Sequence, residues 1–261
     1  MRAMNIGATG MLAQQLNVEV ISNNIANITT TGFKRMRTEF KDLLYENLRR
    51  PGAQSSDAGT IVPTGIQVGN GVAPGAVYRV NIQGSIEQTG NALDLAINGR
   101  GYLQIQMPDG TTAYTRDGAL QLDANGQVVT SDGFPLIPSI TVPADTTDIS
   151  INDSGEVFAK IDGQINLSNL GQIQLATFAN PAGLEAIGDN LLRETPASGT
   201  ATTGAPLSNG FGKLRQSSLE KSNVDIVQEL TNLITAQRAY EMNSRVIKSA
   251  DDMLTSLNQL R

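Results

Sequence analysis

The sequence predicts an α+β protein: discontinuous N- and C-terminal helices pair as an α-helical coiled coil, with an inserted, mostly antiparallel β domain and an extended arm between them. Apolar residues recur at helical spacing near both termini, and turn-forming dipeptides crowd the middle of the 261-residue chain. This length suffices for one or two domains with a buried core. The expected order is an N-terminal helix at 1–35, an extended arm at 36–76, a β domain at 77–192, a return connector at 193–221 and a C-terminal helix at 222–261.

The first helix has two apolar ridges on different sides. One ridge consists of Met4, Met11, Val18 and Ile25. The other consists of Ala8, Leu12, Leu16 and Val20. A helix that is apolar nearly all round must be buried, yet pairing with the C-terminal helix accounts for one ridge only. We expect another copy of the same chain to cover the second.

Three asparagines, Asn23, Asn24 and Asn27, stand near the end of this helix. They are compatible with a polar helix end that frays into Thr29–Thr31, with Gly32 as a suitable C′ residue. However, Asn23 and Asn27 continue the second ridge, where a packed assembly would desolvate their amides. Because a buried Asn in a coiled-coil seam fixes register and partner number, we favour that role.

A segment rich in Gly, Pro and Ser, residues 49–75, leads from the first helix to the β domain. The β domain is then punctuated by Asx-Gly and Ser-Gly pairs between short apolar runs, which is a strong local hairpin signal. These pairs are Asp109-Gly110, Asn125-Gly126, Asp132-Gly133, Ser154-Gly155 and Asp162-Gly163. Their succession predicts an antiparallel β domain.

The C-terminal helix carries an apolar seam at alternating spacings of four and three residues, which drifts in the sense of a left-handed coiled coil. The seam begins with Ile226, Leu230, Leu233, Gln237, Tyr240, Ser244 and Ile247. At about 1.5 Å per residue this helix would be roughly 57 Å long. Such a rod is typical of a filament component.

Composition excludes several kinds of chemistry. The chain has no His and no Cys, so it has neither Ser-His-Asp nor Cys-His catalysis, nor His-ligated zinc, nor disulfides. Its acidic residues stand mostly in turns beside Gly, where a solvated carboxylate is the simpler interpretation than an acid pair as in a glycosidase. We predict no catalytic residue, no metal and no cofactor.

The charge pattern and the hydropathy limit the kinds of partner that the chain can have. Residues 51–210 hold five Lys or Arg against fifteen Asp or Glu, and no basic stripe with interleaved aromatics is present, which argues against nucleic acid. The cluster Lys34, Arg35, Arg37 and Lys41 could bind an acidic surface, including the acidic middle of a neighbouring copy, but a solvated charged face is the commoner explanation. Because polar residues interrupt the N-terminal apolar run and no stretch approaches about 18 apolar residues, we expect neither a cleaved signal peptide nor membrane insertion.

Five segments carry a resemblance to a known family. The segments "NNIANITTTGFKR" (Asn23–Arg35) and "SNVDIVQELTNLITAQRAYEMNSRVIKSADDML" (Ser222–Leu254) resemble the terminal motifs of the bacterial flagellar axial proteins, which form rod and hook. "NALDLAINGRGYLQI" (Asn91–Ile105) and "YTRDGALQLDANGQVV" (Tyr114–Val129) are similar to the β domain of rod and hook subunits. Within that family, "DLLYENLRRPGAQSSDAGTIVPTGIQVGNGV" (Asp42–Val72) resembles the distal rod branch.

The resemblance implies a structural subunit of the flagellar basal-body distal rod, not an enzyme. Such a subunit is exported without a cleaved signal peptide and polymerises helically into a rigid hollow drive shaft across the periplasm, which transmits motor torque to the hook and gives passage to exported subunits. Its implied partners are further copies of itself, the proximal rod proteins, the hook protein, the surrounding periplasmic and outer-membrane ring proteins, and the flagellar type III export machinery.

The resemblance also implies which residues act in assembly. Those expected to pack in the inner core of the tube are Leu12, Leu16, Val20, Asn23, Asn24, Asn27, Gly32, Phe33, Ile226, Leu230, Leu233, Gln237, Tyr240, Ile247 and Leu254. The arm at 49–75 would pack between subunits and stiffen the tube. Its expected residues are Pro51, Gly52, Gln54, Pro63, Gly65 and Val68.

Three alternatives remain open. Within the family the chain is alternatively a hook or proximal rod subunit. From another class, it is a peptidoglycan-cleaving rod accessory, which needs an acid pair in a cleft. A self-contained soluble binding protein is the third, and it predicts terminal helices that are well protected in the monomer.

Overall fold

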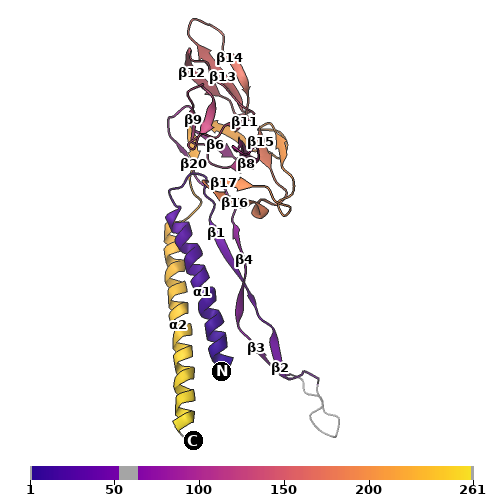
Figure 1. Ribbon diagram of the computed structural model, residues 1–261, viewed down its shortest axis with the longest axis vertical. Coiled ribbons are helices and arrows are strands. Elements are labelled where there is room, and N and C mark those ends of the chain that lie inside the picture. Colours follow the sequence, from indigo (N-terminus) through magenta and orange to yellow (C-terminus); the bar gives the residue numbers. More distant parts are fainter. Residues whose placement is uncertain (1, 53–63, 260–261) are drawn as a thin grey trace. The chain divides into compact units, whose positions relative to one another are not determined.

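The computed structural model describes residues 2–52 and 64–259 (Figure 1). Two compact units make up the chain. The helical unit contains Met1–Ile25, Met36–Tyr78 and Asp225–Arg261, and the β unit contains Ala26–Arg35 and Arg79–Val224. The predicted fold class is confirmed: the two terminal helices pack together, and the region between them is rich in antiparallel strands.

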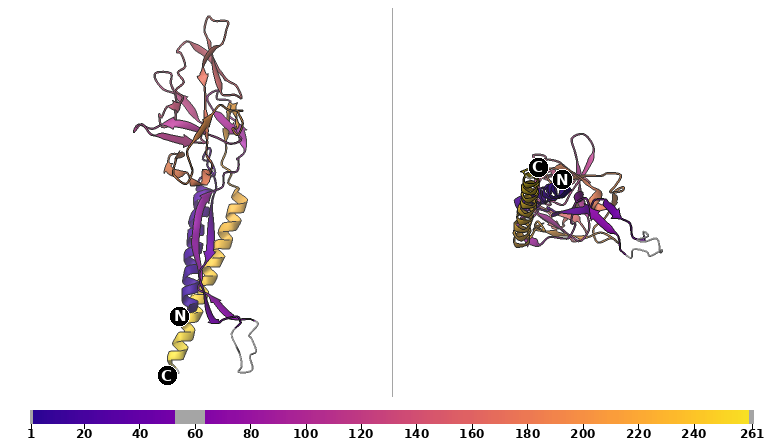
Figure 2. Two further views of the ribbon diagram at one scale, coloured as in Figure 1. Left: turned by 90° about the vertical axis from the view of Figure 1, so that its right-hand side faces the viewer. Right: turned by 90° about the horizontal axis from the view of Figure 1, so that it is seen from below.

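The helical unit is built on α1 (Arg2–Ala26) and α2 (Ile226–Gln259), which run antiparallel (Figure 2). The second helix begins four residues later than expected because Asp225 caps it. The Oδ1 atom of Asp225 accepts hydrogen bonds from the backbone N–H groups of Val227 at 2.9 Å and Gln228 at 3.2 Å.

The expected extended arm is a pair of two-stranded antiparallel ribbons in the same unit. Strand β1 (Met36–Asp42) pairs with β4 (Val72–Arg79), and β2 (Tyr45–Arg49) pairs with β3 (Ile66–Gly69). The ribbons approach α1 closely at Gly71, whose φ of +112° is one that residues with a side chain rarely adopt. A Cβ atom there would lie 2.2 Å from Oγ1 of Thr9.

The largest sheet of the β unit has seven strands, and all of its pairs are antiparallel. Its path is β16 (Glu185–Gly188), β17 (Leu191–Arg193), β8 (Thr112–Thr115), β7 (Tyr102–Gln106), β15 (Leu175–Thr177) and β18 (Thr202–Gly204), with β11 (Leu136–Ile137) paired to β7. A short 3-10 helix, η1 (Pro181–Gly183), precedes β16.

Smaller antiparallel sheets complete the β unit. They are the three-stranded sheet β12 (Thr146–Ile151), β13 (Glu156–Ile161) and β14 (Ser168–Gln172), and the pairs β9 (Leu120–Leu122) with β10 (Val128–Thr130), β6 (Leu95–Asn98) with β19 (Lys213–Gln216), and β5 (Ile86–Gln88) with β20 (Ser218–Glu220). The segment 193–221, expected to be a return connector, thus contributes strands β18, β19 and β20. The backbone N–H and C=O groups of this segment pair with neighbouring strands. In a loose connector these groups would have no partners in the sheets.

One apolar core fills the centre of the β unit. Its fully buried side chains include Leu95, Ile97, Leu103, Leu120, Leu136, Ile140, Ile173, Leu175 and Leu214. The five predicted Asx-Gly and Ser-Gly turns are confirmed, since each glycine has a positive φ, between +76° and +85°. The turns place successive short strands antiparallel, so that alternate side chains meet in this core.

We predict that Leu103→Ala destabilises the β unit by about 2–5 kcal/mol, because it leaves a cavity in a fully buried position. The same change at Leu122, which is 41 % exposed, should cost less than about 1 kcal/mol. Urea unfolding monitored by circular dichroism measures both. Equal losses at the two positions would contradict the assignment of the core.

Candidate assembly site

The two terminal helices approach closely because small residues line their contact. A Cβ atom on Gly7 would lie 2.8 Å from Cγ1 of Ile247, and one on Gly10 would lie 2.7 Å from Nδ2 of Asn243. Ala236 is 2 % exposed. The glycines of α1 thus leave room for Ile247 and Asn243 of α2, and the α2 residues at this contact include small, polar and apolar side chains.

Half of the large apolar residues predicted for the α2 seam point to solvent. Ile226 is 46 % exposed, Leu230 45 % and Tyr240 43 %. Gln237 is also exposed. The half-buried members of the predicted set are Leu233, Ile247 and Leu254. The apolar residues of α2 are spread over more than one face, so its periodicity does not decide which face meets α1. The close approach at the glycines of α1 favours the face with the smaller side chains.

The second ridge of α1 divides in the same manner. Leu12 is 66 % exposed, Leu16 is half-buried, and Val20 is buried within the subunit. The exposed large apolar residues of both helices are Leu12, Ile226, Val227, Leu230, Ile234, Tyr240, Met242, Val246 and Met253. A single subunit leaves these side chains in water, which is costly unless a partner covers them.

Of the three asparagines, Asn24 is the one buried within the subunit, at 1 % exposure. Its Nδ2 group donates to the carbonyl of Met36 at 2.8 Å and to Oε2 of Glu229 at 3.2 Å, and its Oδ1 atom accepts from the Met36 N–H at 2.8 Å. One amide thus joins α1, the first strand of the arm and α2. Asn23 is exposed and Asn27 is half-buried.

The other predicted assembly residues lie near the chain's entry to the β unit and in the arm. The N–H of Gly32, with φ +69°, donates to the carbonyl of Glu220 at 2.8 Å, and Phe33 is half-buried. In the arm, Pro51 and Gly52 are exposed, whereas Gly65 and Val68 are half-buried. Gln54 and Pro63 lie outside the described residues.

A buried ion network lies where the chain enters and leaves the β unit. The carboxylate of Glu220, 1 % exposed, accepts from Lys34 Nζ at 2.5 Å, from Arg116 Nε at 2.6 Å and from the Gly84 N–H at 2.8 Å. Burial by itself raises the pKa of this carboxyl. The Arg116 charge and the Lys34 hydrogen bond outweigh that effect and hold the pKa below its usual value.

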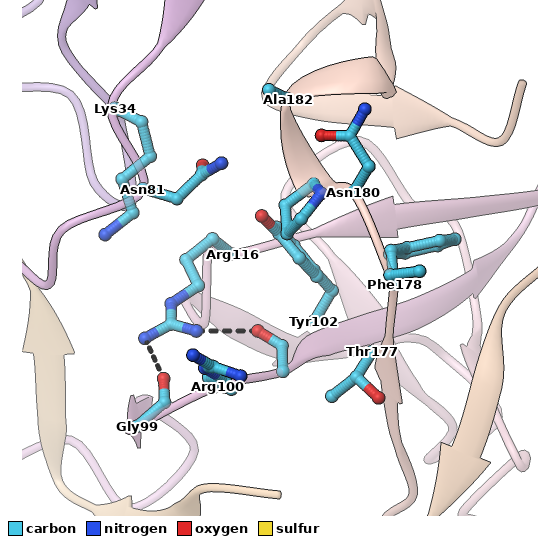
Figure 3. Close-up of a pocket in the computed structure, with 13 residues that line it drawn as sticks. Lys34, Asn81, Gly99, Arg100, Tyr102, Arg116, Thr177, Phe178, Asn180 and Ala182 are labelled. Carbon is cyan, nitrogen blue, oxygen red and sulfur yellow. Dashed lines mark hydrogen bonds between the residues drawn. The ribbon is translucent and has the colours of Figure 1, made fainter. Parts of the chain in front are cut away.

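Arg116 is fixed by the backbone as well as by Glu220. Its terminal nitrogens donate to the carbonyls of Gly101 at 2.6 Å, Gly99 at 2.8 Å and Ile97 at 2.9 Å (Figure 3). This arrangement places a guanidinium against the wall of a pocket of about 330 Å³. We name it the cationic pocket; it is lined chiefly by Lys34, Arg100, Tyr102, Arg116, Phe178 and Pro181.

Sequence reasoning missed this network. The prediction of a solvated basic cluster is wrong for Lys34, which is 7 % exposed, and the sequence pattern does not indicate Glu220 or Arg116 as site residues. The available signal is weak: Glu220 ends the short strand β20, in which buried residues alternate, and Arg116 directly follows β8. Charge alone indicates a surface position, so only the tertiary contacts reveal the pairing.

The described part of the chain offers no metal centre of a recognisable kind. Within it, no three His, Cys, Asp or Glu side chains gather closely enough to hold a metal ion. Neither helix, over the residues described, is long and apolar enough to cross a membrane. The features that call for a function are therefore the exposed apolar helix faces, the arm and the cationic pocket.

Comparison with known proteins finds three family matches along the chain. Residues 4–34 match "Flagella basal body rod protein", residues 96–159 match "Flagellar hook protein FlgE/F/G D1 domain", and residues 215–260 match "Flagellar basal body rod FlgEFG protein C-terminal". The chain is 59% identical over 261 residues to the flagellar basal-body rod protein FlgG of Caulobacter vibrioides, covering all of both chains. It is 51% identical to the protein of that name from Agrobacterium fabrum, over 99% of each chain. It is also 31% identical to the flagellar hook-basal body complex protein FlhP of Bacillus subtilis, over the whole of both chains.

We predict that Glu220→Gln destabilises the β unit by about 3–5 kcal/mol at neutral pH, because it leaves Lys34 and Arg116 buried without their anion. The control is Glu87→Gln, which removes the exposed ion pair with Lys221 and should cost less than about 1 kcal/mol. Urea unfolding of the purified chain measures both.

The same variant gives a pH test. Because the pKa of Glu220 is lowered in the folded state, its stabilising contribution is fully present above the ordinary value of 4.5 and is lost as pH falls through the lowered value. The difference in unfolding free energy between wild type and Glu220→Gln should therefore shrink as the pH falls below 4.5. A difference that grows on acidification would contradict the ion network.

Proposed function

Since this chain belongs to the flagellar basal-body rod protein family, we propose that it serves as a structural subunit of the distal rod. In that role it polymerises helically into a rigid hollow shaft, which carries motor torque to the hook and lets exported subunits pass. The proposed site is the flagellar basal body, with the rod crossing the periplasm.

The exposed apolar surface of the paired helices carries this proposal. Leu12 on α1 and the exposed aliphatic residues of α2 lie on an antiparallel pair whose inner seam is already filled. Apolar surface of this extent on a subunit marks a contact with other proteins. Copies of the same chain offer matching helix faces, and packing them side by side would build the wall of a tube.

The proposed partners follow from the position of a rod in the flagellum. They are further copies of this chain along the rod, proximal rod proteins below, the hook protein above, and the periplasmic and outer-membrane rings around it. The type III export machinery would deliver the chain without cleavage of a signal peptide.

A mechanical role requires rigid contacts between subunits and no chemical reaction, so we propose that the chain has no enzymatic activity. The purified protein should release no soluble fragments from isolated cell wall; release of fragments would favour the accessory enzyme instead.

The alternative within the family is a hook or proximal rod subunit. The resemblance of the arm segment, residues 42–72, to the distal rod branch supports the distal rod. Replacing the distal rod protein of a motile bacterium with this chain should restore straight rods in isolated basal bodies, seen by electron microscopy. Curved, hook-like polymers would favour the hook assignment.

The arm provides the first prediction about mechanics. Because we propose that it packs between subunits and stiffens the tube, deletion of residues 52–69 should yield rods that bend like a hook. The curvature of the rods is measured on electron micrographs of isolated basal bodies. A straight, stiff rod formed by the deletion variant would count against the role of the arm.

Substitutions of the asparagines distinguish effects on the stability of the subunit from effects on its assembly. Asn24→Leu removes hydrogen bonds that join α1, the arm and α2, so it should destabilise the isolated subunit by about 1–3 kcal/mol. Asn23→Leu, at an exposed position, should reduce rod assembly more than export. Thermal unfolding, counts of rods and the amount of exported chain are the three measurements. Unchanged assembly of Asn23→Leu would contradict a register-setting role for this amide.

A further inference from the structure

The cationic pocket gathers positive charge within an acidic unit. The β unit contains ten Lys or Arg and fifteen Asp or Glu, yet Lys34, Arg100 and Arg116 all line this one pocket. Burial raises the pKa of Tyr102, and the charges of Arg116 and of a fourth cation, Arg79, partly offset that effect. Glu220 neutralises one of these charges and is itself buried beneath Arg116 and Lys34. The pocket therefore retains an excess of positive charge that suits a carboxylate.

Tyr102 adds a hydrogen-bonding group without a partner. Its side chain is 93 % buried, since 7 % of its area is exposed, and its hydroxyl makes no hydrogen bond within residues 2–52 and 64–259. Figure 3 shows this hydroxyl directed toward the space beside Asn180. Phe178 packs edge-on to the Tyr102 ring at 5.9 Å and forms an apolar wall. The pocket thus presents donors next to an apolar surface, and it suits a ligand with a carboxylate near an aliphatic group.

The tip of the β13–β14 hairpin presents that combination. Its turn, residues 162–167, carries Asp162, which is exposed, and Ile165, whose side chain is 102 % exposed. Leu167 in the same turn is 56 % exposed. An isolated exposed aliphatic residue needs no explanation, but a fully exposed isoleucine three residues from an aspartate at a projecting tip forms a compact acidic and apolar knob.

The knob and the pocket lie at opposite ends of the β unit. Figure 1 shows the β12–β13–β14 sheet at one end, whereas β16, which follows the pocket residues of η1, is at the other. The hairpin therefore cannot reach the pocket of its own subunit. Complementary patches on different parts of one molecule make a heterologous contact, which generates an open polymer instead of a closed dimer.

We propose that the β13–β14 hairpin of one copy inserts into the cationic pocket of the next copy along the rod. Asp162 then meets Arg100 and the hydroxyl of Tyr102, and Ile165 packs against Phe178 and Pro181. The contact rests on the proposed function, because it requires a polymer of this chain. It supplies a link between β units in addition to the packing of the terminal helices.

Disulfide cross-linking tests the contact, since the natural chain has no cysteine. The variant Ile165→Cys/Ala182→Cys places one thiol on the knob and one at the pocket. Oxidised rods in isolated basal bodies should yield a ladder of dimers and longer oligomers on a non-reducing gel, because a disulfide forms when Cα atoms approach within about 4.4–6.8 Å. The matched control, Ala124→Cys/Ala182→Cys, moves the first thiol to the exposed β9–β10 turn and should yield no ladder.

A charge exchange tests the same contact independently. Arg100 and Asp162 are both exposed, so Arg100→Glu and Asp162→Arg should leave the melting temperature of the purified chain unchanged. Each should lower the number of rods per cell about tenfold, because like charges then face each other across the contact. The double variant Arg100→Glu/Asp162→Arg restores opposite charges and should recover rod number to within about threefold.

The outcomes are distinguishable. Straight rods in normal number from both single charge variants, together with no ladder from Ile165→Cys/Ala182→Cys, overturn the hairpin contact and leave the rod function standing. Failure of the unsubstituted chain to form rods contradicts the proposed function, and with it the contact. A ladder together with recovery in the double charge variant supports both.

Discussion

A buried carboxylate holds together the two places where the chain enters and leaves the β unit. Glu220 stands at the exit, Lys34 at the entry and Arg116 in between, and the Glu220 carbonyl also receives the N–H of Gly32. A buried ion pair adds little net stability compared with an apolar substitute. Removing one partner is strongly destabilising, however, because the other charge is then buried without a counter-charge. The network therefore specifies which backbone segments meet, and the β unit is closed at its base as a result.

The helical unit solves a related problem with an amide. Asn24 bonds to the backbone of Met36 and to Glu229, so the direction in which the arm leaves α1 is coupled to the position of α2. An amide that donates and accepts on the same residue fixes both a distance and an orientation. In a structural rod subunit, such polar contacts define geometry, whereas apolar faces supply the energy of association.

The terminal helices illustrate how far periodicity alone leads. It indicates two long apolar helices that pair, and the structure confirms that pairing. It does not indicate which face is inside, because Ile226, Leu230 and Tyr240 satisfy a seam pattern as well as the small residues that meet α1. The choice was made by Gly7 and Gly10, whose missing side chains allow α2 to approach along one line only. That preference depends on a partner helix and is absent from either segment alone.

The sequence by itself determined the helix–β–helix order, the antiparallel turns, the absence of His and Cys chemistry and the resemblance to flagellar axial proteins. These features depend on local spacing and composition, which a linear pattern retains. The tertiary structure alone decided that Lys34 is buried, that residues 193–221 complete the β sheets, and that Arg100, Tyr102 and Phe178 share one pocket. Such facts depend on contacts between residues far apart in the chain, where charge, burial and distance are set by the fold and not by the neighbouring residues.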